Sequence, residues 1–272
     1  MKLCRLIIPV LGMLAIALPL VTRAQQPPPP PQQAQAQGER PPQAIEPKAD
    51  HLLREMGETL RAAKSLSFTG HAIIDQVMPD GQKVQYAKNQ KVWLRRPDSL
   101  AADVVGDVDE FQFRYDGKQV GLYSERTNSW GAAPAPASIE NTLDMLAQQY
   151  GLIVPLADLA FPDPYKCLIE QVRQGQYIGT GYVGDTKCHH LAFRQASVDW
   201  QIWIDQGDKP LPRKIVITFK DSPALPQYTA FLADWNLAPQ LDDATFELKP
   251  PASAKKVEFA PATQPSAGGA NK

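Results

Sequence analysis

The stretch FQFRYDGKQVGLYS, residues Phe111–Ser124, decides the fold class. Aromatic and polar residues alternate over Phe111–Tyr115, as they do in a strand with one buried and one solvated face. The turn pair Asp116-Gly117 follows, and Gln119–Ser124 then forms a second run with strand character. Two such runs joined by Asp-Gly predict a β-hairpin, in which the strands are antiparallel.

Similar runs joined by short turns flank this hairpin on both sides. No crossover helix separates the successive runs, which argues against a parallel α/β sheet, and a mainly β (α+β) fold is expected. About eleven strands are many for an open sheet, and we expect a curled antiparallel sheet or incomplete β-barrel. The remaining predicted strands are Ser67–Val77, Lys83–Leu94, Leu100–Val105, a short piece at Trp130, Gln176–Val183, Lys187–Gln195, Val198–Asp205, Arg213–Phe219, Gln227–Trp235 and a weak Thr245–Leu248.

Two amphipathic helices are available to cover this sheet. Lys48–Lys64 carries an apolar stripe at helical spacing. A second helix follows Ser138, a residue suited to the N-cap, and its apolar positions are Ile139, Leu143, Leu146 and Tyr150. A third, shorter helical stretch is expected between Pro155 and Val172. We interpret the first as an amino-terminal cover and the second as an internal lid.

Large apolar side chains concentrate on one face of the predicted sheet. Because antiparallel sheets commonly cover one face and solvate the other, this face should lie beneath the helices. A curled sheet covered by few helices tends to leave interior volume that a ligand can occupy, although the same side chains could also fill an ordinary core. The candidate ligand-lining residues are Phe111, Phe113, Tyr115, Leu191, Phe193, Trp200, Ile202, Ile204, Ile215, Ile217, Phe219, Phe231 and Trp235.

Both ends of the chain differ from this core. Residues 1–24 have a basic start and then an apolar run, which is typical of a secretory signal cleaved between Ala24 and Gln25. A retained membrane anchor is the alternative, but the run is shorter than the roughly 20 residues of a bilayer span. Residues 25–47 predict a Pro/Gln-rich disordered linker and residues 250–272 a disordered tail, which leaves residues 48–249 as the folded domain. We therefore expect a soluble periplasmic protein without a permanent membrane anchor.

Export exposes the two remaining cysteines to oxidising conditions. Cys167 and Cys188 are therefore predicted to form a disulfide, with two buried free thiols as the alternative. The neighbouring pair His189-His190 invites a metal site, but adjacent residues of a strand point to opposite faces. We therefore predict no metal, with His189 inward beside Leu191 and His190 outward.

Catalytic and nucleic-acid signatures are absent from the sequence. It contains no Gly-x-Ser-x-Gly, no His-Glu-x-x-His and no Gly-rich phosphate loop. Asp199 and Asp205 would lie about 20 Å apart along an extended strand, too far for a glycosidase pair. A net charge of −1 argues against nucleic acid as a partner. We expect no enzyme and no cofactor.

The order of these elements resembles the LolA/LolB-like superfamily of periplasmic lipoprotein carriers over roughly residues 48–249. Its most recognisable pieces are Tyr115-Asp-Gly-Lys118 before Val120-Gly-Leu-Tyr123, and Trp200-Gln-Ile-Trp-Ile-Asp205 before Pro210-Leu-Pro-Arg-Lys-Ile215. The strings Cys188-His-His-Leu-Ala-Phe193 and Leu156-Ala-Asp-Leu-Ala-Phe161 are similar to a family of predicted periplasmic proteins of unknown function. The resemblance implies an incomplete barrel with an amino-terminal helix and a helical lid over an apolar cavity.

The sequence departs from that superfamily in two respects. LolB-type members carry an acylated cysteine, and no cysteine directly follows this signal. LolA-type carriers use a cavity arginine to hold the lid closed, and the sequence does not assign that role to any arginine. Lipoprotein transport is therefore not transferred to this chain.

The sequence leaves two candidate functions for the predicted domain. The first is a periplasmic binding or carrier protein for a hydrophobic ligand, such as a lipid or acyl chain, held against the concave face of the sheet. The alternative is an envelope partner-binding or regulatory module, whose partner could be an inner-membrane protein. A cavity of several hundred Å³ would favour the carrier, and a filled core would favour the partner module.

Overall fold

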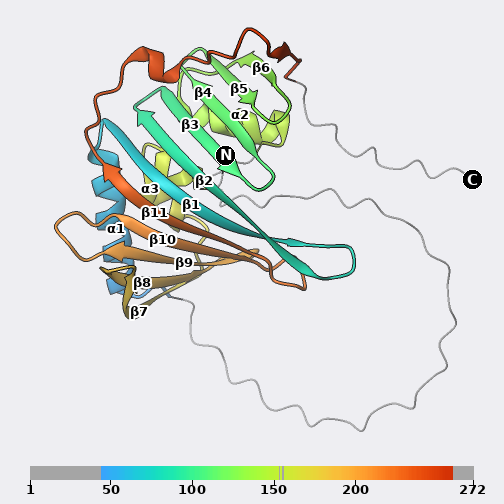
Figure 1. The fold of residues 1–272 in the computed structure, drawn as a ribbon. Helices are drawn as coiled ribbons and strands as arrows, with labels where there is room; N and C mark the ends of the chain where they lie inside the picture. Colours follow the sequence, from blue (N-terminus) through green and yellow to red (C-terminus); the bar gives the residue numbers. More distant parts are fainter. Residues whose placement is uncertain (1–43, 153, 155, 260–272) are drawn as a thin grey trace, which may run out of the picture.

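The computed structural model describes residues 44–152, 154 and 156–259 of the 272-residue chain (Figure 1). The predicted signal and its cleavage site lie outside the described residues. One sheet of twelve strands forms the body of the structure, and its spatial order is β12-β6-β5-β4-β3-β2-β1-β11-β10-β9-β8-β7. The sheet is curled and open, because its edge strands β12 and β7 do not pair with each other. The predicted fold class is confirmed.

The strands form two meanders that meet in the middle of the sheet. Strands β1–β6 pair in sequence order, as do β7–β11, and the pairing of β11 with β1 joins the two halves. All these pairs are antiparallel, whereas β12 pairs with β6 in parallel. The strands are β1 (Ser65–Val77), β2 (Lys83–Arg95), β3 (Ser99–Gly106), β4 (Glu110–Tyr115), β5 (Gln119–Ser124), β6 (Ser129–Pro134), β7 (Gln174–Val183), β8 (Thr186–Arg194), β9 (Val198–Asp205), β10 (Pro212–Phe219), β11 (Gln227–Asn236) and β12 (Lys255–Lys256).

The three α-helices among the described residues lie on one side of this sheet (Figure 1), which we call the inner face. Helix α1 (Pro47–Ala62) has proline in its first turn, where the missing N–H costs nothing. Helix α2 (Ile139–Tyr150) is capped by Ser138, whose Oγ accepts the Asn141 N–H at 3.2 Å. Helix α3 (Pro164–Ile169) and the 3₁₀ helix η1 (Ala157–Ala160) form the third predicted helical stretch.

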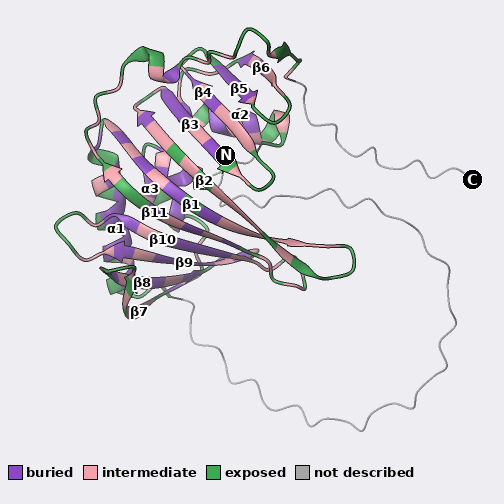
Figure 2. Ribbon diagram, in the orientation of Figure 1, coloured by how far each residue is buried: buried purple, intermediate pink, exposed green. Residues whose placement is uncertain are grey.

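Alternation along the strands divides buried from solvated side chains (Figure 2). In β9, Val198, Trp200, Ile202 and Ile204 face the helices and are buried, while the residues between them are half-buried on the outer face. His189 faces inward and His190 outward, as predicted, because their partners in β9 are Ile204 and Trp203. The inner face and the apolar stripes of the helices together form one core.

The folded part extends beyond the predicted domain at both ends. Ile45 forms a parallel bridge to Gly175, and the Glu46 N–H donates to the Gly175 carbonyl at 3.0 Å, so the predicted linker ends earlier than expected. At the other end, β12 pairs with β6 within the predicted tail. The weak strand predicted at Thr245–Leu248 is wrong: Asp243–Phe246 forms the 3₁₀ helix η2 on the outer side of β3, where Phe246 is buried.

The predicted disulfide between Cys167 and Cys188 is also wrong, because Cys188 is a free, buried cysteine. Leu191 and Phe193 face inward, so Cys188 faces outward with His190. Cys167 lies in α3 on the inner side. A bridge between them would have to pass through the sheet.

Burial makes Cys188 a poor nucleophile, since it raises the pKa of this thiol to about 11. We expect iodoacetamide to leave Cys188 unmodified in the native protein near pH 8 and to alkylate it after unfolding in guanidinium. Peptide mapping by mass spectrometry measures both states. Rapid native alkylation, or a Cys167–Cys188 peptide under non-reducing conditions, would contradict this placement.

Candidate functional site

A small apolar space lies between the inner face and the lid, which we define as α2 and η1. Its floor comes from β1, β2, β3 and β11, and its roof comes from the lid and the adjoining loop. The remaining free volume is about 60 Å³, about that of two water molecules in the liquid. The lining residues of this sub-lid space are Leu66, Phe68, Gln90, Val92, Leu94, Leu100, Leu143, Val154, Leu156, Ala157, Leu159, Ala160 and Trp235.

A β-bulge places Trp235 in this lining. The pairing of β1 with β11 slips between Ser67 and Thr69, and Asp234 in the bulge has a φ of 52°. The extra residue turns Trp235 inward, where its ring stacks on Phe68 with centroids 4.5 Å apart. The indole Nε1 donates to the Pro212 carbonyl at 3.0 Å, which fixes the ring.

The same bulge corrects one predicted residue. Phe231 and Trp235 are four apart and would share a face in a regular strand, but Phe231 pairs with the outward His71 and lies on the outer face. The other twelve candidate lining residues occupy inward-facing strand positions, and one of them, Phe111, also borders a hollow on the outer face that is described below. Of these, only Trp235 borders the sub-lid space, together with Leu143 of the lid.

Most of the predicted lining residues belong to the filled part of the core. Helix α1 lies against β7 and β9, where Trp200, Ile202 and Ile204 are at most 1% exposed. The lid residues Ile139 and Leu146 are likewise buried, and Tyr150 packs edge-on against Phe259 at 4.8 Å. The open half of the inner face is thus the half built by β1–β3, which the sequence did not single out.

Arg96 connects the lid to helix α1. Its Nη1 donates to the carbonyls of Ala160 at 2.6 Å and Phe161 at 2.9 Å, at the end of η1. Its Nε donates to the Ala63 carbonyl at 3.3 Å, beyond the last turn of α1. Carbonyls at helix ends lack helical partners, so one guanidinium satisfies acceptors from both elements. No sequence pattern singles out Arg96, because its acceptors are backbone atoms distant along the chain.

A second residue missed by the sequence reasoning is Asp158 in η1. Its side chain is 4% exposed, and burial raises the pKa of its carboxyl to about 7. An isolated aspartate in a short Leu-Ala-Asp-Leu-Ala segment carries no signal of this burial. The lid therefore contains a carboxyl group that titrates near neutrality.

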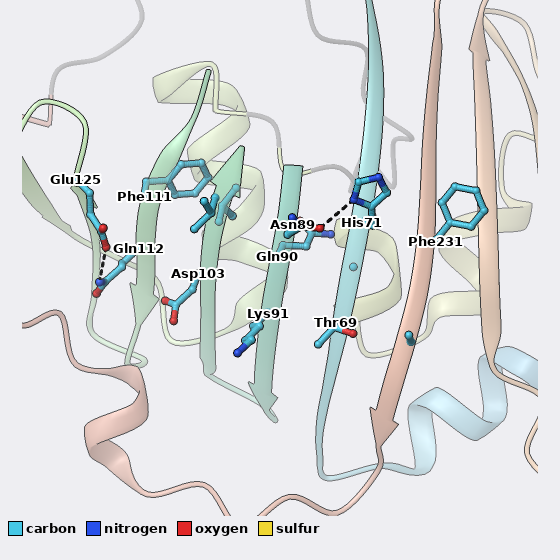
Figure 3. Close-up of a pocket in the computed structure, with 14 residues that line it drawn as sticks. Thr69, His71, Asn89, Gln90, Lys91, Asp103, Phe111, Gln112, Glu125 and Phe231 are labelled. Atoms are coloured by element: carbon cyan, nitrogen blue, oxygen red, sulfur yellow. Dashed lines mark hydrogen bonds between the residues drawn. The ribbon is translucent and has the colours of Figure 1, made fainter. Parts of the chain in front are cut away.

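A larger hollow lies on the outer face of the sheet, away from the lid (Figure 3). It has a volume of about 510 Å³ and crosses β11, β1, β2, β3 and β4. We call it the outer groove. It is lined by Thr69, Gly70, His71, Asn89, Gln90, Lys91, Asp103, Val104, Val105, Phe111, Gln112, Glu125, Phe231 and Ala233.

The protein therefore belongs to the class whose fold is an open, curled antiparallel sheet with helices covering one of its faces. The chain belongs to the DUF2092 family of predicted periplasmic proteins, whose model matches residues 49–260. This confirms the family predicted from the sequence, and its description agrees with the predicted periplasmic location. Among the described residues, no helix combines the length and apolar character needed to cross a bilayer.

Several solved structures are similar to the chain. The lipoprotein LppX of Mycobacterium tuberculosis has 14% identity and a TM-score of 0.46, with 72% of this chain and 100% of that one covered. An uncharacterised protein of Thermus thermophilus has 12% identity and a TM-score of 0.45, with 78% and 99% covered. A LolA superfamily protein of Nitrosomonas europaea has 12% identity and a TM-score of 0.37, with 74% and 97% covered. No curated protein matches the sequence.

Proposed function

We propose that this protein is a periplasmic binding or carrier protein for one hydrophobic ligand, such as a lipid acyl chain, held between the inner face and the lid. The observation that carries this proposal is the lining of the sub-lid space. Every lining residue except Gln90 is apolar, and they come from strands and a lid that are distant in the sequence. Such a lining suits a ligand that contributes apolar surface and few hydrogen bonds.

The lid must move for such a ligand to enter, because about 60 Å³ does not hold an acyl chain. The segment that follows α2 supports this movement, since Leu152 and Val154 are 38% and 41% exposed beside the lining. Displacing η1 from Arg96 would free its carbonyls to solvent without opening the core beneath α1. The structure therefore corresponds to the closed form in this proposal.

Burial of the acyl chain supplies the free energy for binding and for displacing the lid in this proposal. Each buried methylene contributes about 0.8 kcal/mol, so a chain of about 14 carbons offers roughly 11 kcal/mol gross. Ordering of the ligand and displacement of the lid reduce this figure. A Kd near or below about 1 μM corresponds to roughly 8 kcal/mol net and is within reach.

A partner-binding module remains the second candidate function, and the small sub-lid volume favours it. In that case the lid is a fixed part of the core, and regulation of a membrane protein would use another surface. The two functions differ in one measurable property, which is uptake of an apolar ligand by delipidated protein.

Val154→Asp is expected to weaken binding of cis-parinaric acid at least tenfold. The side chain borders the sub-lid space but is partly exposed, so the variant should fold, while a carboxylate there opposes burial of an acyl chain. Ligand fluorescence measures the Kd. The control is Leu225→Asp, an equally apolar and exposed position in the β10–β11 loop, which should bind as the parent does. No uptake by the delipidated parent protein would reject the carrier function and leave the partner module.

A further inference from the structure

The outer groove is a second site on the opposite face of the sheet from the sub-lid space, and Gln90 of β2 is the one residue that lines both. The carboxy-terminal segment with η2 covers the outer side of β3 near Phe246, but none of its described residues lines the groove, whose lining side chains are drawn in Figure 3. Its volume of about 510 Å³ falls within the range of small-molecule sites. The outer groove is not part of the site proposed for the hydrophobic ligand.

Two parallel rows of outward side chains border the groove. One row runs from Phe231 through His71 and Asn89 to Val105, each paired with the next across neighbouring strands. The other row runs through Thr69, Lys91, Asp103 and Gln112 in the same way. Crossing five strands at about 4.8 Å per step makes the groove roughly 19 Å long, perpendicular to the strands. An elongated ligand fits this shape.

The polar atoms of the groove include donors and acceptors that remain available. Among the described residues, no ion-pair or hydrogen-bond partner contacts the side-chain ammonium of Lys91. Asn89 Oδ1 interacts with His71 Nδ1 at 2.9 Å, which leaves the two amide N–H donors of Asn89. Gln112 Nε2 donates to Glu125 Oε1 at 3.0 Å, which leaves the Gln112 carbonyl and the second Glu125 oxygen as acceptors.

The charges of the groove balance one another. Asp103 is paired with Arg114, the atoms Oδ1 and Nη2 being 2.7 Å apart. Lys91 and Glu125 then contribute one charge of each sign. A groove with no net charge does not favour a polyanion, such as a nucleic acid or a polyphosphate.

Apolar surface lies beside these polar groups. Phe231 closes one end, where the Lys214 ammonium lies 5.1 Å from its ring centroid on the side of β10. The other side faces the His71 ring, with the centroids 6.5 Å apart. Val105, at the β3 end of its row, is 56% exposed. The ligand should therefore combine apolar patches with groups that donate and accept hydrogen bonds.

A sugar chain meets these requirements better than a peptide does. Each hydroxyl both donates and accepts, and the C–H face of a sugar ring packs on an aromatic or aliphatic side chain. An extended peptide would bring backbone N–H and C=O groups, yet the backbone groups of these central strands are already paired within the sheet. We propose that the outer groove binds a linear, uncharged oligosaccharide.

Titration of the full chain with cellotetraose or chitotetraose tests this assignment, with isothermal calorimetry for the Kd and amide NMR shifts for the location. We expect binding of at least one tetrasaccharide, with shifts clustered on β1–β4. Lys91→Ala and Phe231→Leu should each weaken the Kd about tenfold, through loss of a charged hydrogen bond and of an aromatic contact. Lys187→Ala is the matched control, an exposed lysine of β8 outside the groove, and should bind normally.

Thermal unfolding verifies that each variant is folded, and acyl binding by Lys91→Ala should equal that of the parent because the lid site lies on the other face. The assignment is overturned if neither tetrasaccharide binds, or if binding is unchanged in folded Lys91→Ala and Phe231→Leu. Stronger binding of a proline-rich peptide than of either sugar would also overturn it.

Discussion

Gly57→Ala is expected to destabilise the protein by about 2 kcal/mol, because helices α1 and α3 touch at this glycine. A Cβ at position 57 would lie 2.6 Å from the Cβ of Tyr165 and 2.9 Å from its backbone nitrogen. Overpacking against backbone atoms costs roughly 1–3 kcal/mol, and the better helix propensity of alanine offsets up to about 1 kcal/mol of it. The contact cannot relax cheaply, since Tyr165 OH also bonds Asp50 Oδ1 at 2.5 Å and Arg54 Nη2 at 2.7 Å.

Urea unfolding of the parent and of Gly57→Ala measures this loss. The control is Glu58→Ala, the next position of α1, which is exposed and should change the free energy of unfolding by less than about 0.5 kcal/mol. Equal midpoints for Gly57→Ala and the parent would show that α3 does not lie against α1 as described.

Asp158→Asn is expected to stabilise the protein above neutral pH and to change little in acid. The folded carboxyl has a pKa of about 7 against a reference value of 3.8, so burial favours its protonated form. Below pH 3.8 both folded and unfolded states keep the proton. As the pH rises from there to about 7, the unfolded state releases its proton more readily, and the free energy of unfolding falls. Asparagine does not ionise, so the free energy of unfolding of the Asp158→Asn variant does not fall in this way.

The expected gain for Asp158→Asn reaches about 4 kcal/mol at full ionisation, from three pKa units at 1.36 kcal/mol each. Chemical unfolding at about pH 4 and about pH 8 measures it. The control is Asp185→Asn in the exposed β7–β8 turn, for which both pH values should give the parent's free energy. A gain for Asp158→Asn that is the same at both pH values would contradict the burial of this carboxyl in the lid.

The fold was predictable to a large degree because alternation and turn residues are local signals. The capped helix at Ile139–Tyr150 has the predicted bounds, and the hairpin differs only at its start, because β4 begins at Glu110 instead of Phe111. The outward orientation of Cys188 could also have been predicted. Leu191 was predicted to face inward, and residues three apart in a strand point to opposite faces. The bulge at Asp234 could not be predicted from the sequence, because whether an aspartate adopts a left-handed conformation depends on how its strand pairs with the neighbouring strand.

Only the apolar character of the sub-lid space could be predicted from the sequence. An apolar face beneath a lid follows from composition, but its open part depends on which strands α1 covers. Arg96 and Asp158 gain their roles from carbonyls and burial supplied by other elements. The outer groove arises from polar and apolar residues on five strands, whose register no local pattern encodes.

Intermolecular NOEs between ¹³C-labelled palmitate and delipidated, methyl-labelled protein test the central claim most directly. Binding under the lid predicts contacts from the acyl chain to the methyl groups of Leu143, Leu159 and Leu66, which border the sub-lid space from both sides. The absence of any NOE at saturating palmitate, or contacts confined to the outer-face residue Val105, would contradict it.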